Sequence, residues 1–109
     1  MNWKEISSEE DIESIIKTSY HKPQLLFKHS TRCNISSVVK NRLENVTDRE
    51  TLDFNYLDLI KYRGISNLIA DKFSVHHESP QVLLIQNGNC IFDESHYAIL
   101  PDEIFQALQ

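Results

Sequence analysis

The 109 residues suffice for one domain that buries roughly 60–65% of the surface its unfolded chain exposes. With 40% apolar and 25% charged residues, the composition is that of an ordinary globular protein, and the net charge of -5 argues against nucleic acid or an anionic membrane as a partner. No apolar run approaches the ~18 residues that a membrane span needs, and residues 1–5 lack the apolar core of a signal peptide. Two cysteines make no disulfide framework, so we expect a single domain over residues 1–109 in the reducing cytoplasm.

The first predicted element is a helix that begins near Ser7. Ser7 and Glu10 have the spacing of a capping box, in which side chains satisfy free backbone N–H groups of the first turn. A stripe of isoleucines follows, and the helix should end near Tyr20, because a residue before a proline such as Pro23 avoids the helical region. A short apolar run then predicts a strand over residues 24–29.

A second helix is predicted over residues 33–45. Apolar residues recur there at steps of three and four, which is the pattern of an amphipathic helix: Ile35, Val38, Val39, Leu43 and Val46. Cys33 therefore lies where a buried strand passes into a helix N-terminus.

Residues 53–61 predict a second strand, which Gly64 ends, and the apolar spacing over residues 65–73 predicts a short helix. The helix that begins near Cys33 connects the two strands. Such a crossover makes the strands parallel, with a right-handed connection.

The last third of the chain predicts a hairpin and a final helix. Pro80 opens an apolar strand over residues 82–85, and Asn87-Gly88 is typical of a two-residue hairpin turn. Residues 90–93 form the return strand, and Pro101 begins the helix. The complete order, α-β-α-β-α-β-β-α, indicates an α/β fold with a central mixed sheet of about four strands and helices on both faces.

Cys33 is the candidate functional residue because of its place at a helix N-terminus. Backbone N–H groups there lack intrahelical partners and the helix dipole is positive, so such sites stabilise thiolates and bring cysteine pKa values from about 8.5 towards 3.5–7.5. No acidic residue occurs between Glu13 and Glu44. Ser36 stands where a Cys-x-x-Cys motif has the thiol that resolves a mixed disulfide. The alternative is that Cys33 is a small, buried apolar residue.

Several segments together resemble the YtxJ family, the monothiol bacilliredoxins of the thioredoxin-like superfamily. The resemblance covers nearly the whole chain, and its specific parts surround Cys33 and Pro80. It implies a thioredoxin-like fold in which the Ser79–Pro80 peptide is cis and lies against the active cysteine. Asn34 departs from the family, which has proline there to pre-set the first helical turn, and we interpret it as a change in redox tuning. The matching segments are residues 30–36, Ser66-Asn67, residues 70–73, residues 77–82 and Ser95-His96-Tyr97.

The resemblance also implies a reaction, the reduction of mixed disulfides between proteins and bacillithiol by a cytoplasmic thiol–disulfide oxidoreductase. Cys33 would be the attacking thiol, S-thiolated proteins the substrates and bacillithiol a low-molecular-weight co-substrate, with no cofactor. We expect a monomer. The expected substrate contacts are Arg32, Asn34, Ser36, Ser79, Pro80 and His96.

Three of these contacts have a specific chemical rationale. The planar guanidinium of Arg32 matches the carboxylates of bacillithiol, unless it simply points into water. The backbone at Ser79 and Gln81 would hold an extended substrate by strand addition. His96, at the end of the return strand, should come back towards Cys33 as a base or a substrate contact, unless it is an ordinary surface histidine.

Cys90 is not expected to pair with Cys33. If Pro80 lies at the active-site end, about six strand residues at ~3.3 Å each carry the chain roughly 20 Å away before Cys90 begins the return strand. A disulfide needs Cα atoms within about 7 Å. A metal site is not expected either, because no ligand spacing joins the histidines: His29, His76, His77 and His96.

Two further functions remain open from the sequence. In one, the protein is a redox sensor or adaptor in which Cys33 is modified but never turns over. In the other, it is an interaction domain with an inert, buried Cys33. A de-bacillithiolation assay separates the first from catalysis, and iodoacetamide labelling of the native protein tests the second.

Overall fold

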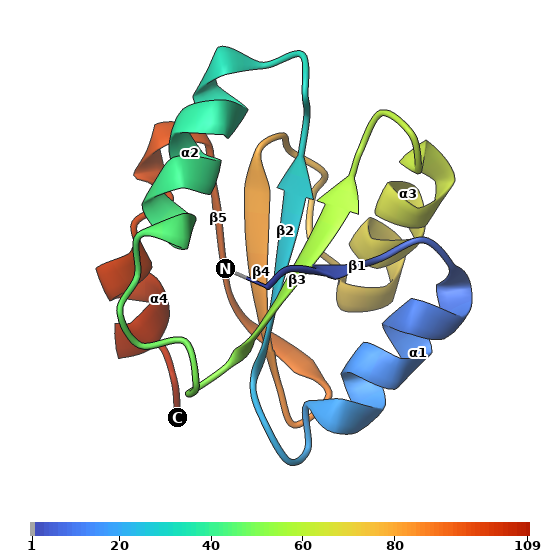
Figure 1. Ribbon diagram of the computed structural model, residues 1–109. Helices are drawn as coiled ribbons and strands as arrows, with labels where there is room; N and C mark the ends of the chain where they lie inside the picture. Colours follow the sequence, from blue (N-terminus) through green and yellow to red (C-terminus); the bar gives the residue numbers. More distant parts are fainter. Residues whose placement is uncertain (1) are drawn as a thin grey trace.

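The computed structural model describes residues 2–109 and contains a five-stranded sheet covered by helices on both faces (Figure 1). No helix within residues 2–109 is long and apolar enough to cross a membrane. The strands are β1 (Lys4–Glu5), β2 (Gln24–His29), β3 (Asp53–Asp58), β4 (Gln81–Gln86) and β5 (Asn89–Ser95). The helices are α1 (Glu9–Thr18), α2 (Asn34–Glu44), α3 (Arg63–Phe73) and α4 (Pro101–Gln106), with a 3-10 turn, η1, at His96–Ala98.

The sheet is mixed, with the strand order β1-β3-β2-β4-β5. β2 and β3 are parallel, as the crossover through α2 predicted, whereas β4 runs antiparallel to both β2 and β5. Lys28, near the end of β2, lies opposite Gln81, the first residue of β4. The loop after β2 and the loop before β4 therefore leave the sheet at the same end.

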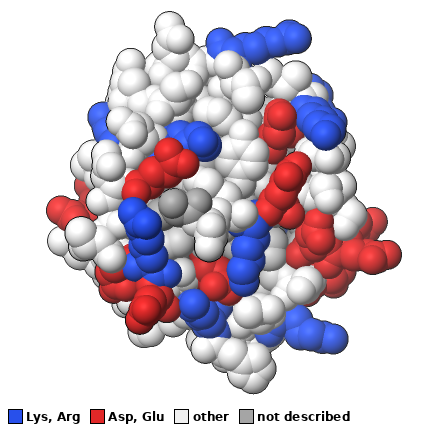
Figure 2. Space-filling view, in the orientation of Figure 1, with Lys and Arg blue, Asp and Glu red and all other residues white. Residues whose placement is uncertain are grey.

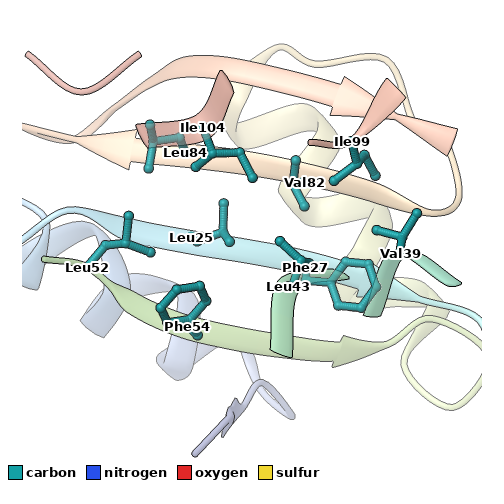
Figure 3. Close-up of a cluster of buried hydrophobic side chains, with 10 residues drawn as sticks. All are labelled: Leu25, Phe27, Val39, Leu43, Leu52, Phe54, Val82, Leu84, Ile99 and Ile104. Carbon is teal, nitrogen blue, oxygen red and sulfur yellow. The ribbon is translucent and has the colours of Figure 1, made fainter. Parts of the chain in front are cut away.

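The two faces of the sheet carry separate hydrophobic clusters, because successive strand residues point to opposite faces. Leu25 and Phe27 face α2 and α4, whereas Leu26 faces α1 and α3. Figure 3 shows the first cluster, which consists of Leu25, Phe27, Val39, Leu43, Leu52, Phe54, Val82, Leu84, Ile99 and Ile104. The second consists of Ile6, Ile12, Ile15, Leu26, Leu57, Ile69, Leu83 and Ile85.

The predicted fold class is confirmed, with three local differences. The strand predicted over residues 53–61 ends at Asp58, whose carboxylate accepts hydrogen bonds from the N–H groups of Ile60 and Lys61, and Gly64 lies within α3. The capping box of α1 is formed by Ser8 and Asp11, one residue later than expected, because Asp11 bonds the backbone N–H of Ser8 while Ser8 bonds that of Asp11. The sheet also has a fifth strand, β1. Its two residues are exposed and show no strand pattern of their own, so it exists only through its pairing with β3.

The β4–β5 hairpin turns at Asn87 and Gly88, as predicted. Both residues have positive φ, 54° and 78°, which the favoured two-residue hairpin turn requires. Their backbone N–H groups donate to the carbonyl and hydroxyl oxygens of Ser19, at 3.0 and 2.9 Å. The hairpin tip is thereby fixed to the end of α1.

Candidate thiol site

Cys33 occupies the N-cap position of α2, at the end of the loop that follows β2. Its backbone is extended, and its carbonyl accepts the first helical hydrogen bond, from the N–H of Ser37 at 3.2 Å. No side-chain hydrogen bond caps the helix, and no acidic residue lies in its first turn. The Cys33 side chain is partly exposed. It is therefore open to a reactant at a helix end whose free N–H groups favour negative charge.

The Ser36 side chain stabilises the loop that carries Cys33 through hydrogen bonds inside the protein. The Ser36 hydroxyl accepts a hydrogen bond from the Ser30 N–H at 3.0 Å and lies 2.6 Å from Nδ1 of His29. Ser36 is fully buried and His29 is 5% exposed. The structure thus gives Ser36 an internal hydrogen-bonding role, and its hydroxyl is not on the surface where a substrate would lie. Nothing in the sequence pattern indicated the contact between these two side chains.

The second loop at this end of the sheet contains the proline expected from the resemblance. The Ser79–Pro80 peptide is cis, Pro80 is buried, and β4 begins at the next residue. Figure 1 shows this loop and the start of α2 at the same end of the sheet, where β2 and β3 finish. The fold therefore places Cys33 and Pro80 on neighbouring loops although 46 intervening residues separate them.

His96 returns to this end, as predicted. Its backbone N–H donates to the Pro80 carbonyl at 3.0 Å, and its φ is 58°. Its ring is half exposed and its Nε2 lies 3.5 Å from the Glu78 carboxylate. Glu78 was not among the sequence candidates, and it places a carboxylate in the loop that leads into Pro80.

The other expected contacts differ in exposure. The side chains of Arg32 and Asn34 are exposed beside Cys33, and Ser79 is partly buried. Gln81 lies inside β4 between Lys28 of β2 and Ser95 of β5, so its peptide groups belong to the sheet and only Ser79 remains to pair with a substrate backbone. Figure 2 shows no acidic side chain at the upper left of this face, where Figure 1 places the start of α2.

A buried polar cluster beneath the cis-proline loop was missed from the sequence. The Lys28 ammonium donates to the Ser66 carbonyl at 3.2 Å and lies 3.3 Å from Nδ1 of His77, while Gln81 donates to the His76 carbonyl at 2.8 Å. Burial lowers the pKa of Lys28 to about 8. The available signal was a lysine that directly follows the apolar run Leu25-Leu26-Phe27 within a predicted buried strand. Two strand side chains thus anchor the segment that leads into Pro80.

Cys90 lies at the opposite end of the sheet from Cys33. It pairs with Ile85, which itself pairs with Gln24 at the start of β2, whereas Cys33 follows the end of β2. Its thiol donates to the Phe92 carbonyl at 3.4 Å, and burial raises its pKa to about 11. Both cysteines are free, and the expected separation is confirmed.

The side chains that could bind a metal ion in the described part of the chain are its histidines, cysteines and carboxylates. Within residues 2–109, no group of three or more such side chains is arranged to hold a metal ion. The pair formed by Glu78 and His96, and the longer contact of 3.9 Å between Glu78 and His76, lie on the exposed rim of the site.

A cysteine at the β2–α2 junction, with a cis-proline that precedes the β4–β5 hairpin at the same end of the sheet, is typical of a thioredoxin-fold protein. Among solved structures, one described by its thioredoxin fold and a provisional oxidoreductase assignment is 30% identical, has a TM-score of 0.85 and covers 95% of this chain and 91% of that one. Reduced thioredoxin from Schistosoma mansoni is 18% identical, with a TM-score of 0.75 and 99% and 100% coverage. Thioredoxin from Fasciola hepatica is 16% identical, with a TM-score of 0.75 and 96% and 99% coverage.

The family model of monothiol bacilliredoxin BrxC matches residues 4–104. The chain therefore belongs to the monothiol bacilliredoxin family and is a thiol redox protein of the thioredoxin fold. The two thioredoxins, at 18% and 16% identity, bear on the fold alone.

Proposed function

We propose that the protein reduces mixed disulfides between proteins and bacillithiol through Cys33. The observation that carries the proposal is the partly exposed Cys33 at the N-cap of α2, at the same end of the sheet as the cis-proline, with a serine at the fourth position of its motif. No second thiol stands nearby in the same motif. Such a site can exchange disulfides with one thiol and an external reductant.

The reaction has two exchange steps. The Cys33 thiolate attacks the bacillithiol sulfur of the mixed disulfide, a Cys33–bacillithiol disulfide forms, and the substrate protein leaves as a thiolate that takes up a proton. A second bacillithiol thiolate then attacks the bacillithiol sulfur on Cys33. Bacillithiol disulfide leaves, and the Cys33 thiolate is restored without gain or loss of electrons by the protein.

The residues around Cys33 supply the substrate contacts of this proposal. The exposed Arg32 guanidinium would bind the carboxylates of bacillithiol, because its planar donors match a carboxylate. The Ser79 backbone beside Pro80 would align the substrate chain, with Asn34 and His96 at the two sides of the site. The proposed reaction uses bacillithiol as co-substrate and no bound cofactor, and its protein substrates are S-thiolated proteins in the cytoplasm.

Turnover with a bacillithiolated protein tests the proposal. With excess bacillithiol, the wild-type protein should release many equivalents of substrate thiol per molecule. Cys33→Ser should release none, and the matched Cys90→Ser variant should retain the wild-type rate, because Cys90 lies at the far end of the sheet. If Cys33 becomes bacillithiolated but no catalytic release follows, the protein is a redox sensor and the proposal is wrong.

A further inference from the structure

The contact between Ser36 and His29 links a titratable ring to the motif that carries Cys33. Ser36 Oγ lies 2.6 Å from His29 Nδ1, and both side chains are buried beneath the first turn of α2. The His29 ring packs against the rings of Phe27 and Tyr56, with a centroid distance of 5.5 Å to each, and those two rings lie 6.4 Å from one another. The ring is therefore fixed in place, and its charge state is the variable part of the contact.

The Ser36 hydroxyl has a single hydrogen, so it can donate only one hydrogen bond at a time. A serine hydroxyl has one hydrogen to donate and two lone pairs to accept. The Ser30 N–H uses one lone pair. A neutral His29 with an unprotonated Nδ1 takes the hydroxyl hydrogen as well, so Ser36 then has no hydrogen left for any other acceptor. A protonated His29 donates from Nδ1 into the second lone pair, and the Ser36 hydrogen becomes free.

We propose that His29 is a positioning residue for Cys33, because its protonation decides whether the Ser36 hydroxyl can donate a hydrogen bond to the thiolate at position 33. With neutral His29 in the tautomer that carries its hydrogen on Nε2, the Ser36 hydrogen is committed to Nδ1 and the thiolate is held by helix N–H groups alone. With protonated His29, Ser36 turns its hydrogen to the thiolate.

The helix geometry brings Ser36 within reach of Cys33. The N-cap residue and the third helical residue are neighbours at a helix N-terminus, as the reciprocal bonds of a capping box require. Cys33 and Ser36 hold these two positions of α2. The first and fourth side chains of a Cys-x-x-Cys motif come close enough for a disulfide, so the matching side chains of Cys-x-x-Ser are close enough for a hydrogen bond.

Charged groups on two elements set the ionisation of His29. Burial, and after it the Lys40 ammonium of α2, lower the pKa of His29, whereas Asp58 of β3 and Glu44 of α2 raise it. The net effect is a lowered pKa, so the neutral ring predominates at pH 7. His29 is 5% exposed and lines an open groove along α2, together with Ser37, Val38, Lys40, Asn41 and Glu44.

A double-mutant cycle on the pH dependence of Cys33 alkylation tests the inference. His29→Phe keeps a ring packed against Phe27 and Tyr56 but removes Nδ1, so Ser36 is released and the alkylation midpoint should fall by about one pH unit, a tenfold change. Ser36→Ala alone should leave the midpoint close to that of the wild type. In the double variant the fall should disappear, because no hydroxyl remains to be released.

Either of two results would overturn the inference. One is an alkylation midpoint that is unchanged in His29→Phe, and the other is a fall in that midpoint that persists in the double variant, which lacks the Ser36 hydroxyl. A second measurement uses the wild-type protein, so it does not depend on whether a variant folds. Coupling is reciprocal, so blocking Cys33 with iodoacetamide should move the NMR titration midpoint of His29 to lower pH, and an unmoved midpoint would contradict the inference. Neither readout needs bacillithiol, so the role of His29 can fail while the proposed exchange function stands.

Discussion

Lys28 shows how a single residue can serve a site without touching a substrate. Lys28 is 1% exposed, and the hydrogen-bond partners of its ammonium among residues 2–109 are the Ser66 carbonyl and the His77 ring, neither of them acidic. Burial, followed by the charges of Lys28 and Arg63, lowers the pKa of His77. A neutral His77 can accept from the ammonium, so the contact holds the segment before Pro80 at neutral pH.

The buried Lys28 predicts a distinctive pH dependence of stability. Its pKa falls from 10.5 to about 8 on folding, so between these values the unfolded chain binds more protons and a rise in pH favours the folded state. Relative to Lys28→Met, the wild-type protein should gain about 2–3 kcal/mol in free energy of unfolding between pH 7.5 and 10. Urea denaturation of both proteins measures this difference, and titrations common to both cancel. A difference that stays constant over this range would show that the ammonium is not desolvated.

At the scale of single elements, the two glycines give opposite expectations for the same substitution. Gly64 lies in the first turn of α3, and a Cβ there would meet nothing within 4 Å, so Gly64→Ala should stabilise the protein by up to about 1 kcal/mol. Gly88 has φ of +78° in the hairpin turn, so Gly88→Ala should destabilise by about 1 kcal/mol or more. Thermal unfolding should show Tm shifts of opposite sign. Shifts of the same sign would contradict the assigned backbone conformations.

The elements that could be predicted from the sequence are those whose pattern is local. The strand over residues 24–29 and the bounds of α2 agree with expectation within one residue, because Pro23, a polar loop and three- and four-residue apolar spacing mark them. β1 could not be predicted, since its pairing with β3 is its only cause. At the N-terminus of α1 the sequence offers two overlapping capping boxes, and only the three-dimensional contacts distinguish Ser8 from Ser7.

The candidate site was predictable only in part, for the same physical reason. Cys33 and Pro80 could be placed because a strand–helix junction and a hairpin opening are visible in the sequence. The contacts of His29 with Ser36 and of Lys28 with His77 join residues on different segments of the chain. The spacing of apolar residues in the sequence therefore gives no indication of them. Polar residues within apolar strands are the one general signal for such contacts.

Across the whole molecule, the two thiols occupy opposite ends of the sheet and different environments. Cys33 is partly exposed at the start of α2, whereas Cys90 packs against the second hydrophobic cluster with its pKa raised to about 11 by burial. The strand β4 runs between these two ends, from Gln81 to Gln86. The fold thus places the two thiols at opposite ends of the sheet and prevents them from forming a disulfide within one chain.

Mass spectrometry of the native protein after one equivalent of bacillithiol disulfide at pH 7 tests this arrangement most directly. Peptide mapping should find a single bacillithiol adduct on Cys33 and a free thiol at Cys90. Excess bacillithiol should then remove the adduct and restore Cys33. An adduct on Cys90, an unmodified Cys33 or an intramolecular Cys33–Cys90 disulfide would contradict the account.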